Sequence, residues 1–161
     1  MHKENIIKEK CSLVEWSLTL KNISNDLWFK PFREGSWGTA DVIAHFISWD
    51  KFMIENRIYF LLRDKDFPKI NVNAESINQE ASKYARSGIS KEDLISEFIY
   101  VRKDLVAQLG NVQPEKFDQP CPGKKHITLC EFFFGMIDHD LKHKEQIETH
   151  IKKYSLKNDI R

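Results

Sequence analysis

Glycine and proline are scarce in this chain, with six and five among 161 residues. Most of them fall near residues 31–38, 68, 88 and 110–123, so the intervening segments hold few helix breakers. No segment alternates apolar and polar residues for long, which argues against extended strands. The chain is therefore predicted to be all-α.

Cysteine is also sparse, since only Cys11, Cys121 and Cys130 occur and no two are spaced as CxxC. An odd, scattered set excludes a disulfide framework and a cysteine-based zinc ribbon. We expect Cys130 to be an inert core thiol. Cys121 stands between two prolines in an expected loop, and we expect it to be more exposed. A catalytic role for it is the less favoured alternative.

An excess of charge of one sign is lacking, because 25 basic residues face 24 acidic ones and the net charge is +1. This balance predicts no dominant phosphate-binding field and argues against a nucleic-acid partner. There is no run of 18 apolar residues, and the N-terminal MHKENIIKEK lacks the apolar core of a signal peptide. We predict a soluble, cytoplasmic protein with no membrane segment.

Apolar periodicity and capping signals predict five helices within one domain over residues 1–161. The helix at 128–154 begins with the capping box Thr128-Leu129-Cys130-Glu131, and Ser90 opens the one at 91–109. Residues 111–127 read as a loop, and the C-terminal KKYSLKNDIR reads as a fraying tail. We expect a four-helix bundle with one shorter helix, the helices covering residues 3–23, 39–67, 74–86, 91–109 and 128–154.

Two histidines in the last expected helix, His139 and His143, are four residues apart. They therefore project from nearly the same face, one turn apart, and can share one metal ion. A third ligand must come from another helix, and His45 is the candidate because it lies mid-helix on an apolar stripe. The alternative is that the pair is partly exposed with hydrogen-bond partners and that His45 is a satisfied core histidine.

Asp140 falls inside the apolar arc of the same helix, where an acidic residue needs a reason. One reason is an outer carboxylate that holds a ligand imidazole by its free N–H. Asp140 could equally pair with a lysine or cap a neighbouring loop. Gln146 continues the row of His139 and His143 and is a second candidate for such an outer contact.

The stretches SWGTADVIAHFISWD and DHDLKHKEQIETH resemble the two metal motifs of the DinB-like superfamily, which includes DinB and YfiT-type proteins. The resemblance covers nearly the whole chain, and the order of the motifs along the helices is similar too. It implies that His45, His139 and His143 bind a divalent metal. The chain departs from the family at Lys142 and Lys144, where a further His or Arg is common, so the substrate contacts stay open.

The superfamily includes metal-dependent hydrolases and thiol transferases, so the resemblance implies one of these activities on a small molecule. Three imidazoles favour zinc or nickel, with iron, cobalt or manganese as alternatives. Hydrolysis would also need a general acid or base, and the candidates are Asp50, Glu55, Asp140 and Gln146. Transfer of a low-molecular-weight thiol would need no nucleophile from the protein.

A non-catalytic bundle that binds or sequesters a small molecule, with a structural or vestigial metal, is the alternative function. A homodimer is also expected. Its basis is the run Phe132-Phe133-Phe134, because three consecutive aromatic side chains on one helix cannot all face one core.

Overall fold

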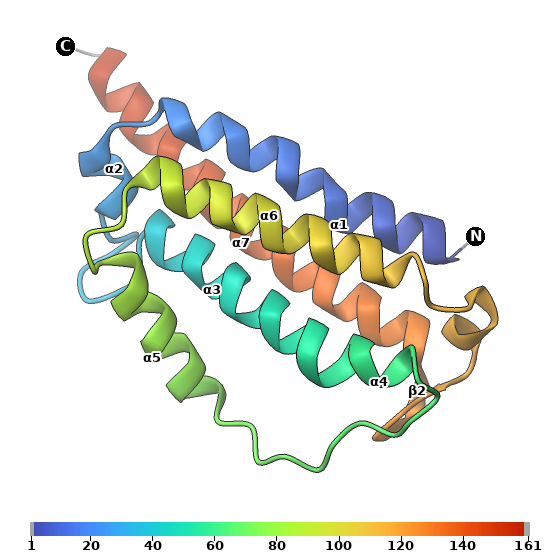
Figure 1. Cartoon of the computed structure of the whole chain (residues 1–161). Coiled ribbons are helices and arrows are strands. Elements are labelled where there is room, and N and C mark those ends of the chain that lie inside the picture. Colours follow the sequence, from blue (N-terminus) through green and yellow to red (C-terminus); the bar gives the residue numbers. More distant parts are fainter. Residues whose placement is uncertain (1, 160–161) are drawn as a thin grey trace.

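In the part of the chain that the structure describes, four long helices pack side by side into a bundle, with a shorter helix on its outside (Figure 1). The computed structural model describes residues 2–159, and their side chains through residue 155. The long helices are α1 (His2–Thr19), α3 (Thr39–Met53), α6 (Lys91–Leu109) and α7 (Leu129–Asp159), and α5 (Ala74–Ala85) packs against α3. The predicted all-α bundle with a short additional helix is confirmed.

The predicted helix starts are confirmed by their hydrogen bonds. The Ser90 hydroxyl accepts from the Asp93 backbone N–H at 3.0 Å. Thr128 and Glu131 form the reciprocal capping box, each side chain accepting from the other's backbone N–H, at 2.9 and 3.1 Å. Such caps satisfy donors that the first turn of a helix leaves free.

Gly38 starts α3, the helix that carries His45. Its N–H donates to the Asp41 carboxylate at 2.8 Å. A Cβ atom at Gly38 would lie 2.6 Å from the backbone oxygen of Lys30, so a side chain has no room there. The close approach of the two backbones fixes where α3 begins.

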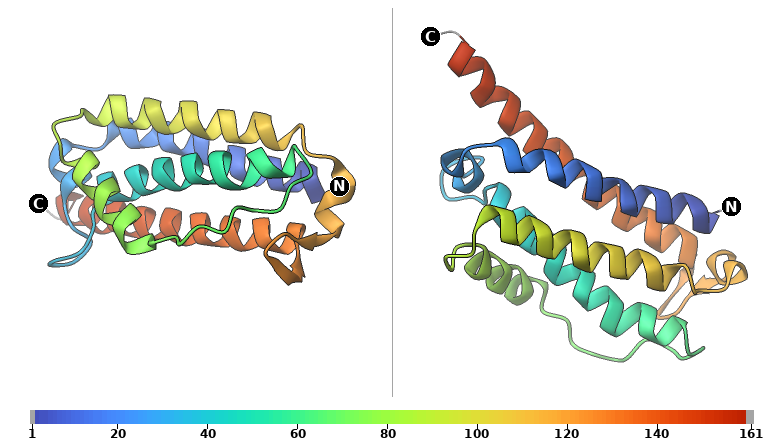
Figure 2. Two further views of the ribbon diagram at one scale, coloured as in Figure 1. Left: turned by 60° about the horizontal axis from the view of Figure 1, so that its bottom comes forward. Right: turned by 45° about the horizontal axis from the view of Figure 1, so that its top comes forward.

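The helix that begins with α3 does not end at Met53. It continues through a π-helical turn (Ile54–Ile58) into α4 (Tyr59–Leu61), and so ends before Pro68 as predicted. Residues 65–73 then run without helix or strand to α5. This strap crosses in front of the space between α3 and α7 (Figure 2, left).

Several short elements were not predicted. Helix α2 (Asn25–Phe29) and the 3₁₀ segments Leu20–Asn22 and Pro114–Asp118 join the long helices. The expected loop before α7 also contains an antiparallel hairpin of β1 (Pro120–Cys121) and β2 (Lys124–Thr128). Strands of two and five residues are too short to produce a period-two signal.

The core consists of two apolar clusters, one at each end of the bundle. Helix α3 packs mainly against α5 and α6, and α7 mainly against α1, so α3 and α7 approach each other only loosely. The looser seam between α3 and α7 is where the candidate site lies. Within the described residues no helix is long and apolar enough to cross a membrane.

Three local expectations were wrong, the last of them within the described residues alone, since residues 160 and 161 of the expected tail lie outside them. Cys121 is fully buried, and burial raises the pKa of its thiol, which argues against a catalytic role. Phe132, Phe133 and Phe134 all pack against one core cluster, so this run gives no reason for a homodimer, which stays a prediction. The C-terminal segment continues α7 to Asp159 instead of fraying, and it extends beyond the other helices (Figure 2, right).

Candidate metal centre

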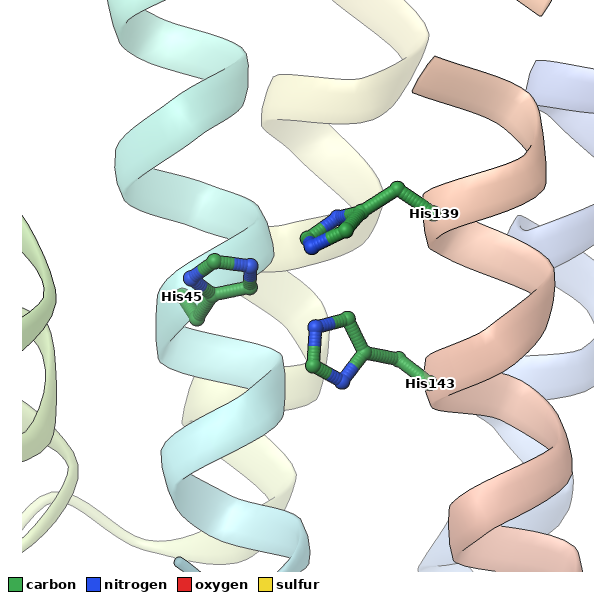
Figure 3. Close-up of side chains that lie close together, drawn as sticks. All are labelled: His45, His139 and His143. Atoms are coloured by element: carbon green, nitrogen blue, oxygen red, sulfur yellow. The ribbon is translucent and has the colours of Figure 1, made fainter. Parts of the chain in front are cut away.

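The three predicted histidines come together across the seam between α3 and α7. His45 projects from α3, His139 and His143 project from α7, and ring nitrogens point into the space between them (Figure 3). One nitrogen of each ring lies within 4.8 Å of the others, and the ring centroids are 4.6 to 5.5 Å apart. The helical spacing placed two of them on one face, and the packing of α3 supplies the third.

Burial disfavours the protonated form of two of the imidazoles. Burial lowers the pKa of His45 from 6.5 to about 4, and it also lowers the pKa of His143. His45 is buried, His143 is half-buried and His139 is exposed, so the cluster opens toward one side. Neutral imidazoles are the form that binds a metal ion.

Asn78 of α5 fixes the tautomer of His45. Its Oδ1 accepts from the Trp49 indole N–H at 2.8 Å, and the same oxygen lies 2.9 Å from His45 Nδ1. Because indole nitrogen only donates, that oxygen must be the acceptor, so His45 Nδ1 carries its proton. The lone pair of His45 is therefore on Nε2, the nitrogen free to bind a metal.

Gln146 makes the outer contact that was proposed for it. Its Oε1 lies 3.3 Å from Nδ1 of His143, one turn away on α7. A proton on Nδ1 again leaves the lone pair on Nε2.

Asp140 does not serve as the carboxylate that holds a ligand imidazole. Within the described residues no hydrogen bond joins it to the three histidines. Its Oδ2 accepts from Lys10 at 2.8 Å and from Arg102 at 3.1 Å. Arg102 also donates to both oxygens of Asp50, at 2.6 and 3.1 Å. The alternative that Asp140 pairs with a lysine is thus the better description.

Arg102 connects the two helices that carry the histidines. Asp50 lies on α3, five residues after His45, and Asp140 lies on α7, directly after His139. The Arg102 guanidinium is fully buried, and the whole group of two acids and two bases is nearly inaccessible to solvent. A buried network with every charge paired favours one alignment of the packed helices.

The remaining acid–base candidates do not reach the centre. Asp50 is held by Arg102, and Glu55 is exposed on the π-helical turn. Glu131 lines the same cavity as His139 but lies two turns earlier on α7, about 12 Å along the helix axis. The described residues therefore supply no obvious general base next to the three imidazoles.

A cavity of about 520 Å³ adjoins the candidate centre, and His45 and His139 line it, whereas His143 does not. The accessible surface of its walls is mostly apolar, although the acidic residues Asp50, Glu131 and Asp140 also line it. Lys124 of β2 lines it too, so the segment expected as a loop at 111–127 borders the site. Volume and lining are typical of sites for small molecules. The principal wall residues are Phe46, Trp49, Ile127, Phe132 and Met136.

The donor set fits a divalent transition metal. A tetrahedral ion with metal–nitrogen bonds of about 2.0–2.1 Å holds its ligand nitrogens about 3.3 Å apart. The nitrogens of His45, His139 and His143 lie within 4.8 Å of one another, so small side-chain rotations suffice. The tautomer that Asn78 fixes leaves the lone pair of His45 available on Nε2.

Comparison with known families agrees with this geometry. The model of the DinB superfamily matches residues 15–147. The chain belongs to the DinB superfamily. No curated protein and no solved structure gives a significant match. The region matched to the DinB superfamily includes all three histidines, Asn78 and Gln146.

Removing the Asn78 side chain is expected to weaken metal binding by this DinB-superfamily chain about 10–100-fold. Loss of an outer partner of a ligand histidine typically costs that much, since the ring loses its tautomer and orientation. Asn78→Leu and a control, Gln79→Leu on the next residue of α5, should be compared by zinc titration calorimetry. Equal affinity of the two variants would show that Asn78 does not orient His45.

Acidification is expected to destabilise the metal-free protein between about pH 6.5 and 4. In this range the unfolded chain binds a proton at His45 that the folded protein excludes, so the free energy of unfolding falls as the pH falls. The full shift corresponds to about 3 kcal/mol. Urea unfolding of His45→Gln should show a flatter pH dependence, whereas His126→Gln, at an exposed position, should match the wild type. A wild-type curve that is flat over this range would contradict the assignment.

Proposed function

We propose that the protein is a metal-dependent enzyme that transfers a low-molecular-weight thiol to an electrophilic small molecule, with zinc or nickel held by His45, His139 and His143. The observation that carries the proposal is the three-imidazole cluster opening onto a mostly apolar cavity. An ion in this position can acidify a bound thiol or water and polarise a carbonyl.

The cavity lining favours an external nucleophile. No serine, threonine, cysteine or tyrosine occurs among the described residues that line it, and Lys10, Asp50 and Asp140 are committed to the buried network around Arg102. Glu131 is the remaining carboxylate in the lining, and it lies two turns from His139 on α7. We therefore expect each reactant to be a small molecule. The chain contributes the ligand imidazoles, their orientation by Asn78, and aromatic walls that exclude water from the reacting groups.

The lack of a nearby base favours a thiol over water. A free thiol has a pKa of about 8.5 and water one of 15.7, and a bound metal ion would lower both, so a thiol needs the smaller shift to ionise. The buried group of Asp50, Asp140, Lys10 and Arg102 has no net charge, and three neutral imidazoles add none. The centre thus favours an anionic nucleophile. Hydrolysis is the second candidate, supported by the same imidazole cluster.

Activity of zinc- and nickel-loaded protein tests the proposal. The tag-free protein should accelerate conjugation of glutathione or cysteine to monobromobimane, and the metal-free protein and His143→Ala should not. Hydrolysis of para-nitrophenyl acetate without thiol would assign the hydrolase instead. Metal binding without either reaction would favour the sequestration alternative and contradict the enzyme proposal.

A further inference from the structure

A second cavity, of about 440 Å³, adjoins the histidine cavity. It lies between the π-helical turn after α3, the first turns of α7, the strap 65–73 and the β1–β2 turn. The two cavities share four wall residues, so they are neighbouring parts of one depression: Trp49, Lys124, Phe132 and Met136. A molecule larger than the first cavity can extend into the second.

Arg57 is held in place on the wall of this second cavity. Its guanidinium lies between two aromatic rings, 5.0 Å from the centroid of Phe52 and 4.9 Å from that of Phe67. One of its N–H groups donates to the backbone oxygen of Asn56 at 2.9 Å. Stacking of this kind pre-organises a guanidinium for bidentate binding of an oxyanion.

The second cavity carries positive charge without a matching acid. Arg57, Lys69 and Lys124 line it, and no Asp or Glu does among the described residues. Arg57 is half-buried and forms no ion pair with a described residue, although most other half-buried or buried cations of the chain do: Lys10, Lys91, Arg102 and Lys116. Lys69 and Lys124 are exposed, and neither forms an ion pair with a described residue. The rest of the lining is apolar, so the unmatched charge favours an anionic, otherwise apolar ligand.

We propose that the small-molecule substrate is an elongated apolar compound ending in an oxyanion, a carboxylate or a phosphate, which Arg57 and Lys124 bind. The inference rests on the proposed function, because it places the other end of this molecule at the three histidines. Twelve residues separate Arg57 from His45, which is about 18 Å or less along the helix. Side chains tilt toward the N-terminus of a helix, which brings the guanidinium closer to the histidines.

Binding of decanoate to the metal-free protein tests the oxyanion site separately from the metal. Quenching of tryptophan fluorescence by decanoate should saturate, with Trp49 as the reporter in the shared wall. Decanol should bind at least tenfold more weakly, and decyltrimethylammonium more weakly still, since both lack the charge-assisted hydrogen bonds. Decyl phosphate distinguishes the two head groups. Equal affinity for decanoate and decanol would overturn the proposal.

Arg57→Gln should weaken decanoate binding about tenfold or more and leave decanol binding nearly unchanged. Arg63→Gln is the matched control. Like Arg57, Arg63 stacks on an aromatic ring, that of Tyr59, and donates to a backbone oxygen. Unlike Arg57, it is exposed and lines neither cavity. If Arg57→Gln is unstable, Lys124→Gln provides the same comparison. Wild-type affinity in both Arg57→Gln and Lys124→Gln would show that these cations only hold the strap and would overturn the proposal.

The two proposals fail in distinguishable ways. If decanoate binding depends on Arg57 but the protein binds no metal, the proposal of an oxyanion site stands and the proposal of a metal enzyme is rejected. The opposite outcome is a metal-loaded protein that transfers thiols at the same rate to neutral and to anionic electrophiles, both as wild type and as Arg57→Gln. This outcome would support the enzyme proposal and reject the oxyanion site.

Discussion

The Arg102→Met variant is expected to lose about 3–5 kcal/mol of its free energy of unfolding. The substitution removes the partner of Asp50 and leaves Asp140 with Lys10 alone, although both carboxylates stay buried. Breaking a buried ion pair by removing one partner is this costly because a charge remains in a poorly polarisable environment. Urea denaturation monitored by circular dichroism measures the loss.

Lys103→Met is the matched control for this variant, since Lys103 is the adjacent cation on α6 and is exposed. Its stability should stay within about 0.5 kcal/mol of the wild type. Adding Asp50→Asn to the Arg102→Met variant should restore part of the lost free energy of unfolding, because it removes one of the two carboxylate charges that have lost their partner. Similar stabilities of Arg102→Met and Lys103→Met would contradict a structural role for the buried network.

Metal affinity of Arg102→Met tests what the network does for the site. Arg102 joins the α3 segment after His45 to the α7 segment after His139, so its loss should let the two ligand helices shift. We expect weaker zinc binding even under conditions where the variant remains folded. An unchanged affinity would show that helix packing alone aligns the histidines.

The His143→Ala variant is expected to lose zinc or nickel affinity by well over a hundredfold. Loss of an outer partner alone costs about 10–100-fold, and this substitution removes a ligand itself. The fold should persist, because His143 is only half-buried. Titration calorimetry gives the affinity, and the melting temperature of the metal-free variant checks the fold.

His126→Ala is the control for that loss, since His126 lies exposed on β2 and takes no part in the cluster. The triple variant His45→Ala, His139→Ala, His143→Ala separates a structural metal from a catalytic one. If it stays folded while activity disappears, the metal is catalytic. If it unfolds under conditions where the wild type is stable, the metal supports the fold, and the enzyme proposal loses its main argument.

The positions of the long helices and the two ligand motifs could be predicted from the sequence because they depend on local signals. Capping residues such as Ser90 and Thr128 act within one turn, and the spacing of His139 and His143 places both on one face by helix geometry alone. His45 was matched to them by resemblance, since no local rule states which helix packs opposite.

The contacts that complete the site could not be predicted, because they join elements far apart in the chain. Asn78 lies 33 residues from His45. On α1, the cation Lys10 is buried, whereas the apolar Cys11 and Leu18 are exposed, which is the reverse of what residue type alone indicates. A buried lysine is expected only when its partner is known, and Asp140 is 130 residues away.

Metal analysis of protein purified without a histidine tag tests the central claim most directly. Mass spectrometry of the intact chain and elemental analysis should show one transition-metal ion per chain, and zinc or nickel should raise the melting temperature of the stripped protein. Both effects should vanish in His143→Ala. The contradicting result is protein that contains no metal and whose melting temperature does not change when zinc, nickel, cobalt, iron or manganese is added. It would show that His45, His139 and His143 do not form a metal centre.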